Sequence, residues 1–573
     1  MSSTVWDLTP LFENEDALTE ALKTASSNAL SFEKKYKNRL KTLTLNEFNE
    51  CVKEYESISQ SLARAMTYAY LKFAQNSDEG SFLAKITNTS KEAEKYLLFF
   101  ELEFNRLDKK TQDSFIKNAE VYDFYLKSLK KEKPHQLNLG IEQVLLKKEQ
   151  VGASAFCRLF DEHFSNMKFN FEGKKISEGE ILSFLYSADR NKRKSAADVF
   201  TKELKKHQPL LGYIFNMIKS DLKIECVIRN YKTPEEPRHK DNKISQKSVD
   251  ALIRATEESF NIAHQYYEKK RELLGFETLY DYDRYAPLEK DDTPFSYEKS
   301  RTIVLKTLKN FSTTFYEIAQ KAFNEGWIDV YPKSKKSGGA FSHPATVDTH
   351  PYLLLNYTNQ RRDLFTLAHE MGHAIHQYLS RKVGYLSSDT PLTTAETASV
   401  FCEMLVFDEM KKNADLKTKR AILSSKIEDI FATLYRQINF TTFERAVHAK
   451  DDELSLKEFN QLWLSQSSKM FGHSVKLTPN YKIWWSYISH FIHAPFYCYA
   501  YAYAQLLVLA LFGLYKSGKT TDFTQKYIEF LALGGSKSPK EMVAAFGFDI
   551  EDEKFWRIGL DEVKKMVDEF KEL

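Results

Sequence analysis

The sequence predicts a mainly α-helical fold that carries one small β-sheet. The 573 residues include only 19 glycines and 14 prolines, so residues that break helices are few. Long segments such as 422–438 place apolar residues three and four positions apart, which is the period of an amphipathic helix. Residues 326–357 differ, because short β-prone runs alternate there with glycine, proline and lysine. The sheet is therefore expected at 326–357, directly before a cluster of histidines.

Composition and charge exclude several classes of protein. With 42% hydrophobic and 28% charged residues, the chain suits a large core and is too long for one small domain. Its 82 basic and 79 acidic residues nearly cancel, unlike those of a nucleic-acid binder. Five scattered cysteines without a C-x-x-C pair argue against a disulfide framework and for a reducing compartment. The first ten residues lack a signal-peptide pattern, so we expect a cytoplasmic protein.

Residues 483–515 form the longest stretch that could suggest a membrane, because they contain no Lys, Arg, Asp or Glu. Only 506–514 is strongly apolar, which is shorter than the roughly 20 residues that span a bilayer. Histidines and a ladder of tyrosines occupy the first half. We expect a helix buried in the protein, with a polar half that lines a cavity, and no membrane.

The histidine cluster lies in "TLAHEMGHAIHQYL", residues 366–379. Apolar residues at helical spacing predict a core helix over 363–380. His369 and His373 are four apart and share one face, so both imidazoles can bind one zinc at about 2.0–2.1 Å. Glu370 lies about 100° round the helix, beside such a metal, where its carboxylate can take a proton from the attacking water.

A third histidine, His376, shares the face of the first two but is not expected to bind the same ion. It lies seven residues beyond His369, roughly 10.5 Å along a straight helix. The extended motif with three histidines uses a glycine to turn the chain, and here His376 occupies that glycine position. We expect it behind the ligands or in the core.

The third ligand is expected from residues 389–405. Pro391 and the threonines after it predict a helix start that places Glu396 inside the helix, with Glu403 on the same face. A carboxylate in uncharged surroundings is costly unless it is paired or binds a metal. Glu396 as ligand, with Glu403 orienting a histidine, completes a His2Glu site with one open position. The alternative is a carboxylate stabilised only by the helix dipole.

With these motifs in place, the sequence resembles oligoendopeptidase F of the thimet-oligopeptidase-like zinc metallopeptidases. The resemblance covers essentially the whole chain and is densest from about 190 to 560. The segments that carry it are 365–374, 396–399 with Glu403, 339–341 with 354–357, 281–288, and 490–499.

The resemblance implies a two-lobed helical clam around a deep substrate channel, with one Zn²⁺ per chain on the channel floor. It implies an N-terminal helical region at 1–190 and a catalytic region at 191–573. Its substrates would be short peptides, cleaved in the cytoplasm. The balanced charge and the short apolar run, rather than the resemblance, predict no nucleic-acid or membrane partner. The oligomeric state stays open.

The family also places a histidine and tyrosines near the zinc, where they donate to the substrate carbonyl. His490, Tyr497 and Tyr501 match best. His493 competes with His490, and tyrosines at every second position permit a slip of two residues.

Local geometry adds an expectation about this segment. Pro495 can open a helix at its first position. Tyr497 and Tyr501 then share one face, and Tyr499 and Tyr503 share another roughly opposite one. One face should meet polar groups of the core, and the other a wet cavity.

Three functions remain open from the sequence. The favoured one is an endopeptidase for short peptides, in which a strand near 339–341 holds the peptide backbone by strand addition. A related exopeptidase would need a cationic anchor for the peptide carboxylate, which the sequence does not locate. A peptide-binding protein without catalysis would have no use for Glu370.

Overall fold

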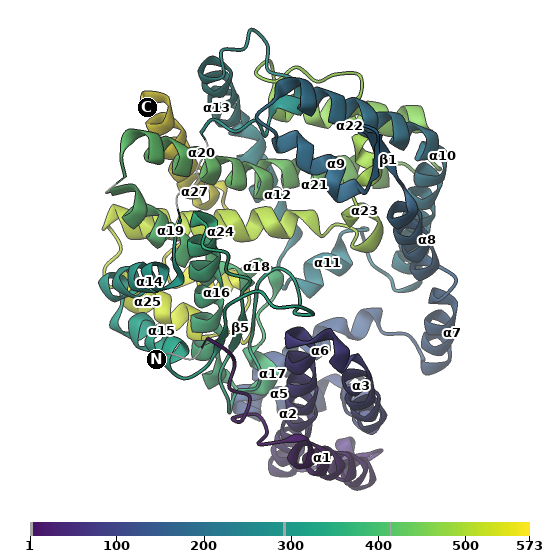
Figure 1. Ribbon diagram of the computed structural model, residues 1–573. Coiled ribbons are helices and arrows are strands. Elements are labelled where there is room, and N and C mark those ends of the chain that lie inside the picture. The colour runs from purple at the N-terminus through teal and green to yellow at the C-terminus, as the bar shows by residue number, and fades with distance from the viewer. Residues whose placement is uncertain (1–3, 290–293, 413) are drawn as a thin grey trace. The chain divides into compact units, whose positions relative to one another are not determined.

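The computed structural model describes residues 4–289, 294–412 and 414–573, and it divides the chain into two compact units (Figure 1). Each unit is assembled from three segments of the chain. Unit 1 comprises Met1–Lys133, Asp292–Met410 and Thr520–Phe546, and unit 2 comprises Pro134–Asp291, Lys411–Lys519 and Gly547–Leu573. The division into regions 1–190 and 191–573 was made along the sequence. It stays a prediction.

Unit 1 is helical apart from one sheet, as predicted. Its longest helix begins with a reciprocal cap, in which the Thr44 hydroxyl accepts from the Glu47 backbone N–H and the Glu47 carboxylate accepts from the Thr44 N–H. The helices are α1 Glu15–Tyr36, α2 Leu45–Gln75, α3 Gly80–Glu94, α4 Phe99–Arg106, α5 Lys109–Asn118, α6 Asp123–Glu132, α14 Tyr297–Phe311, α15 Thr313–Asn324, α16 Arg361–Ser380, α17 Tyr385–Ser388, α18 Leu392–Ala395, α19 Thr397–Lys412, α25 Phe523–Ala532 and α26 Pro539–Ala544.

The sheet of unit 1 lies within the predicted range and has three strands, β3 Ile328–Asp329, β4 Phe341–His343 and β5 Tyr352–Leu354. Their order is β3-β5-β4, so the two ends of the range pair in parallel and β4 pairs antiparallel at the other edge. All of β5 is buried. The side chain of Gln377 on α16 donates to the Ser342 carbonyl at 3.1 Å. The sheet is thereby fixed beside the helix that carries the histidines.

Helix α16 is packed on several sides within unit 1. It contacts α14, α15, α25, β4 and β5. Its buried residues recur every three or four positions, which is the pattern that predicted a core helix over 363–380. The mainly α-helical class with one small sheet beside this helix is confirmed.

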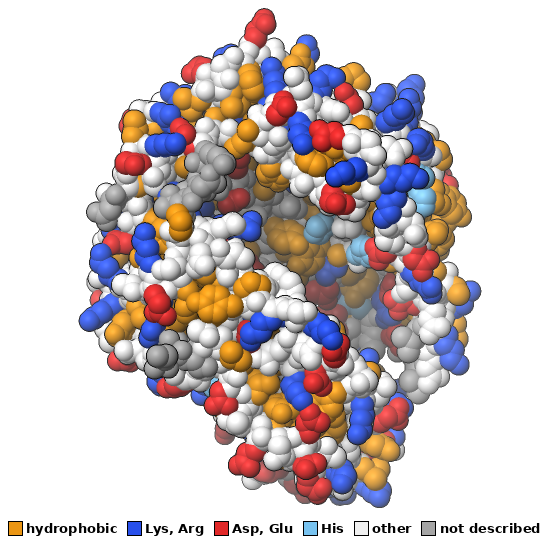
Figure 2. All heavy atoms as spheres, in the orientation of Figure 1, with side chains coloured by type: hydrophobic (Ala, Val, Ile, Leu, Met, Phe, Trp, Pro, Cys, Tyr) orange, Lys and Arg blue, Asp and Glu red, His pale blue; other side chains and the backbone are white. Residues whose placement is uncertain are grey.

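Unit 2 adds a short hairpin that the sequence patterns did not indicate, β1 Phe169–Phe171 with β2 Lys174–Ile176. On the face in Figure 2, basic and acidic side chains are interspersed, in keeping with the balanced composition. The helices of unit 2 are α7 Leu139–Glu149, α8 Ala153–Asn166, α9 Glu178–Ser183, α10 Arg190–Ile228, α11 Glu236–Asp241, α12 Gln246–Glu258, α13 Phe260–Leu273, α20 Leu416–Thr433, α21 Tyr435–His448, α22 Leu456–Phe471, α23 His490–His493, α24 Cys498–Ser517 and α27 Glu553–Glu572, with 3₁₀ turns η5 Phe184–Tyr186, η6 Asp281–Asp283 and η8 Tyr481–Tyr487.

Helix α24 is the core helix of unit 2 (Figure 1). By length and composition it could cross a membrane, but 89% of its most apolar stretch is buried inside the protein. It packs against α12, α20, α21 and α27. A Cβ added to Gly559 of α27 would lie 2.7 Å from the Leu506 carbonyl oxygen, so glycine permits this close approach. The backbones of α24 and α27 are therefore in contact at Gly559, and a side chain there would push the two helices apart.

We expect Gly559→Ala to lower the free energy of unfolding by about 1–3 kcal/mol, because the new methyl group must displace a helix backbone. Gly179→Ala is the matched control, since a Cβ there meets nothing within 4 Å. Denaturant unfolding of both variants measures the difference. Equal stability of the two variants would show that α24 and α27 do not pack this closely.

Candidate functional site

Three ligand atoms converge in unit 1. The Nε2 atoms of His369 and His373 lie 3.2 Å apart. Oε2 of Glu396 lies 3.3 Å from each of them. Tetrahedral bonds of about 2.0 Å would separate the ligand atoms of zinc by about 3.3 Å. The donor set and its spacing therefore fit one zinc ion, and these three residues could hold it.

Two further side chains hold the ligands in this arrangement. Oε1 of Glu403 lies 3.3 Å from Nδ1 of His369, which leaves Nε2 of the same ring directed to the centre. The Ser399 hydroxyl donates to Oε2 of Glu396 at 2.7 Å. Glu403 thus lies where the sequence analysis expected a carboxylate that orients a histidine.

The backbone at Glu396 differs from the prediction. Glu396 does not lie inside a helix, because α18 ends at Ala395 and α19 begins at Thr397. The Tyr527 hydroxyl donates to the Thr397 carbonyl at 2.8 Å, and the Ser399 hydroxyl shares its proton between Oε2 of Glu396 and the Glu396 carbonyl, which is 3.0 Å away. These bonds come from tertiary and local contacts that the pattern of residues does not reveal.

Gly372 permits the close approach of α16 and α19, a role that was not predicted from the sequence. A Cβ at Gly372 would lie 2.4 Å from the Ala398 carbonyl oxygen and 2.6 Å from the Ser399 Cα. Any side chain would therefore push α19 away from α16. The glycine between Met371 and His373 was the available signal.

His376 lies in the core behind the ligands. It is buried, and it makes a hydrogen bond at the backbone of Ala395. Burial lowers its pKa to about 4, so the ring is neutral at pH 7. Its contact with the residue before Glu396 links the histidine helix to the third ligand.

The electrostatics of the cluster favour a bound cation. Burial alone lowers the pKa of His369, but hydrogen bonds to Glu396 and Glu403 outweigh burial and raise it to about 10. Burial alone raises the pKa of Glu396, and the two histidines reverse this and hold it well below its usual range. The carboxylates therefore stabilise positive charge where the three ligand atoms meet.

Glu370 lies next to this point with a different environment. Its side chain is only 6% exposed. Burial raises its pKa, and His369 and His373 oppose the rise. A carboxylate whose affinity for protons is raised is suited to act as a general base.

In unit 2, the structure places His490 against Tyr501. Nε2 of His490 and the Tyr501 hydroxyl are 3.2 Å apart. The rings of Tyr497 and Tyr501 have centroids 5.0 Å apart. Tyr501 is 37% exposed, so its hydroxyl belongs to an accessible face.

Tyr499 and Tyr503 face the core instead. Asn242 donates to the Tyr499 hydroxyl at 2.9 Å, and Ser248 donates to the Tyr503 hydroxyl at 3.0 Å. Both tyrosines are fully buried. One face therefore meets polar groups of the core, as predicted, and the other is accessible, while a cavity at that face stays a prediction.

The turn before these tyrosines differs from the prediction. Pro495 does not open the helix, because α24 begins at Cys498. Phe496 has φ of 56°, a left-handed conformation that L-residues rarely adopt. Its N–H donates to Oε1 of buried Glu444 at 2.9 Å. This bond fixes the turn from which Tyr497 projects.

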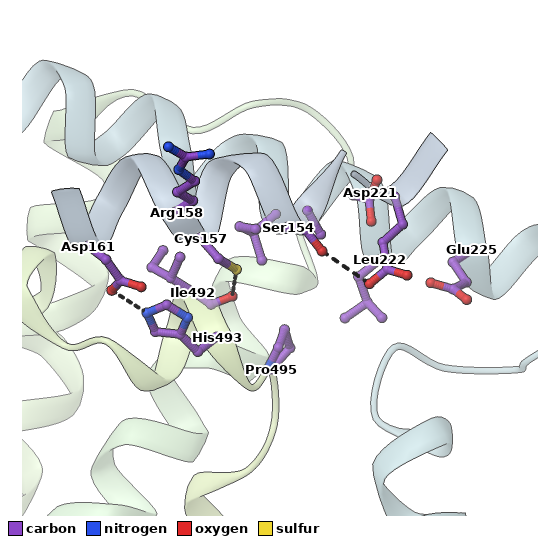
Figure 3. A pocket seen from close by; sticks show the side chains of 13 residues that line it. Ser154, Cys157, Arg158, Asp161, Asp221, Leu222, Glu225, Ile492, His493 and Pro495 are labelled. Atoms are coloured by element: carbon purple, nitrogen blue, oxygen red, sulfur yellow. Dashed lines mark hydrogen bonds and ion pairs between the residues drawn. The ribbon is translucent and has the colours of Figure 1, made fainter. Parts of the chain in front are cut away.

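His493 belongs to a different place in unit 2. Its Nε2 lies 2.8 Å from Oδ1 of Asp161, at the wall of a cavity of about 530 Å³ (Figure 3). The same cavity is lined by Cys157 and Asp221. Of the two competing histidines, it is thus His490 that meets Tyr501.

Comparisons with known proteins identify the family of the chain. The family model described as "Peptidase family M3" matches residues 183–562, and "Oligopeptidase F" matches 103–169. The chain is 28% identical to an oligoendopeptidase F homolog of Borreliella burgdorferi, with 98% of each chain covered. It is 26% identical to oligopeptidase PepF of Bacillus subtilis, covering 99% of this chain and 87% of the relative.

Solved structures share the fold. An oligoendopeptidase-F from Enterococcus faecium matches with a TM-score of 0.71 and 20% identity, covering 97% of this chain and 99% of the other. A structure from Chlamydophila abortus matches with a TM-score of 0.91 and 22% identity, covering 99% and 98%. The resemblance to oligoendopeptidase F is confirmed, and the chain belongs to peptidase family M3, a family of metallopeptidases.

Proposed function

We propose that this protein is a zinc-dependent oligoendopeptidase that hydrolyses internal bonds of short, unfolded peptides in the cytoplasm. The observation that carries the proposal is the convergence of His369, His373 and Glu396, whose ligand atoms lie 3.2–3.3 Å from one another. Bound by these residues, zinc would polarise the scissile carbonyl and make water more acidic.

Glu370 is the general base in this proposal. Its buried carboxylate takes a proton from the attacking water and later gives it to the leaving amine. The raised pKa supports the first transfer, because a more basic carboxylate holds the proton better. A protein that only binds peptides would need no such group.

We propose that three side chains of unit 2 contact or position the substrate: His490, Tyr497 and Tyr501. The Tyr501 hydroxyl donates to the substrate carbonyl oxygen as negative charge develops there. His490, 3.2 Å from that hydroxyl, orients it. Tyr497 packs on Tyr501 and limits the rotation of its ring.

Strand β4 is the proposed support for the peptide backbone. It lies at one edge of the sheet, so among the described residues only β5 pairs with it. Asn356 donates to the Gly339 carbonyl at 2.8 Å and holds the chain just before β4. An extended peptide could add to this edge by backbone hydrogen bonds.

Incubation with a mixed pool of short peptides tests the function. We expect cleavage at internal bonds, also in peptides blocked at both termini, with products identified by mass spectrometry. Release of C-terminal dipeptides alone, and only from peptides with a free carboxylate, would indicate the exopeptidase instead. A folded globular protein is the control and should stay intact.

Glu370→Gln and Glu396→Ala should separate catalysis from metal binding. Glu370→Gln should keep zinc and lose nearly all turnover, because only the proton acceptor is removed. Glu396→Ala should lose zinc affinity, because a ligand is removed. Metal analysis of the purified variants, with kcat on one peptide, measures both. Loss of zinc from Glu370→Gln together with full zinc and activity in Glu396→Ala would reverse the assignment.

Tyr501→Phe should lower kcat by roughly a hundredfold or more and change KM little, because its hydroxyl acts mainly in the transition state. Tyr499→Phe is the matched control on the core face, where the hydroxyl meets Asn242. It should lose some stability and keep its activity. A fast Tyr501→Phe beside a slow Tyr499→Phe would mean that the wrong face was chosen.

A further inference from the structure

We propose that Arg436 of α21 anchors a carboxylate of the bound peptide, either its C-terminal α-carboxylate or an acidic side chain. This inference rests on the proposed peptidase function and adds a determinant of specificity to it. Arg436 lies in unit 2, as does His490.

Within the described ranges, Arg193 and Arg445 of unit 2 each pair with a carboxylate, and Arg436 does not. Arg193 lies 2.8 Å from an oxygen of Asp283, and Arg445 lies 2.7 Å from an oxygen of Glu235. In the part of the chain that the structure describes, no carboxylate oxygen lies within 4.0 Å of the Arg436 guanidinium. A partly buried guanidinium without an anion is costly, so its charge needs another explanation.

Two phenols hold the guanidinium in place. Nη1 of Arg436 donates to the Tyr285 hydroxyl at 3.2 Å, and Nη2 donates to the Tyr487 hydroxyl at 3.1 Å. Because a guanidinium has five N–H groups, donors remain for a ligand. These bonds orient the planar group without neutralising it, which suits paired hydrogen bonds to a carboxylate.

The surroundings reinforce the positive charge. Arg284 is buried nearby, and its Nε donates to the Asp281 backbone carbonyl at 2.9 Å. Burial raises the pKa of Tyr285, yet Arg436 and Arg284 together bring it below its usual value. The two guanidinium groups thus add positive charge around Tyr285.

The anchor is accessible and lies near the residues assigned to the substrate. Arg436 is partly exposed, and Tyr186, which is 59% exposed, stacks on Tyr285 with centroids 4.7 Å apart. Burial lowers the pKa of His490, and the positive charge of Arg436 lowers it further. A carboxylate at Arg436 would thus fix one part of the peptide near His490, with aromatic faces beside it.

A purely structural role predicts different behaviour. Arg436 also lies over the Phe440 ring, 5.0 Å from its centroid, so its removal could simply loosen α21. Loss of packing would weaken all peptides equally. Loss of an anchor would weaken only those that carry the carboxylate.

Four forms of one short peptide distinguish these roles. They combine a free or amidated C-terminus with Glu or Gln at one position. Binding is measured by calorimetry on Glu370→Gln, which should not turn the peptide over, and cleavage on the unmodified chain. We expect one carboxylate to strengthen binding by about tenfold or more. The C-terminal pair and the Glu/Gln pair identify which carboxylate it is.

Arg436→Gln, made in the same Glu370→Gln protein, should abolish that preference, and Arg436→Lys should keep part of it, because the charge remains without the planar fork. Arg254→Gln is the control, since this exposed arginine pairs with Glu553 at 2.6 Å on the surface. It should keep the full preference. Thermal unfolding measures whether each variant is folded. If Arg436→Gln is not folded, Arg436→Lys provides the test, because it should keep only part of the preference.

The outcomes separate the anchor from the proposed function. If the four forms bind and are cleaved alike, or if Arg436→Gln keeps the preference, the anchor is wrong and the peptidase stands. If the unmodified chain cleaves none of the four forms, the proposed function fails, and the anchor fails with it.

Discussion

Unit 1 brings two imidazoles and a carboxylate to one point, and the close contact of helices α16 and α19 makes this possible. Their ligand atoms lie 3.2–3.3 Å apart, and Glu403 adds a second negative charge behind His369. Burying these groups together costs free energy, and a cation bound between them would offset that cost. Gly372 and the helix break at Glu396 are the means by which two helices come close enough to form this arrangement.

In unit 2, polar groups are carried by an apolar helix of the core. Helix α24 is buried along most of its length, yet its first turns carry tyrosines on two faces. Tyr499 and Tyr503 satisfy their hydroxyls inside the core, which fixes the rotation of the helix. Tyr501 is then accessible because the opposite face is held in the core.

Local patterns predicted the elements, and tertiary contacts decided their details. The helix expected at 363–380 is observed at Arg361–Ser380, because apolar periodicity is a property of neighbouring residues. The ligand atoms of His369 and His373 meet because a spacing of four fixes their direction. The break at Glu396 and the turn at Phe496 were not predicted. The Tyr527 hydroxyl and the Glu444 carboxylate, which support them, come from distant parts of the sequence. The parallel pairing of β3 with β5 was likewise not predicted, because it depends on the path of the chain between the two strands.

X-ray absorption at the zinc edge, on the purified protein loaded with one equivalent of zinc, tests whether His369, His373 and Glu396 bind the ion. We expect a first shell of nitrogen and oxygen only, at about 2.0–2.2 Å, with the outer-shell scattering of two imidazoles. A shell with sulfur at about 2.3 Å, or one with no imidazole scattering, would contradict it, because zinc would then be bound away from His369 and His373.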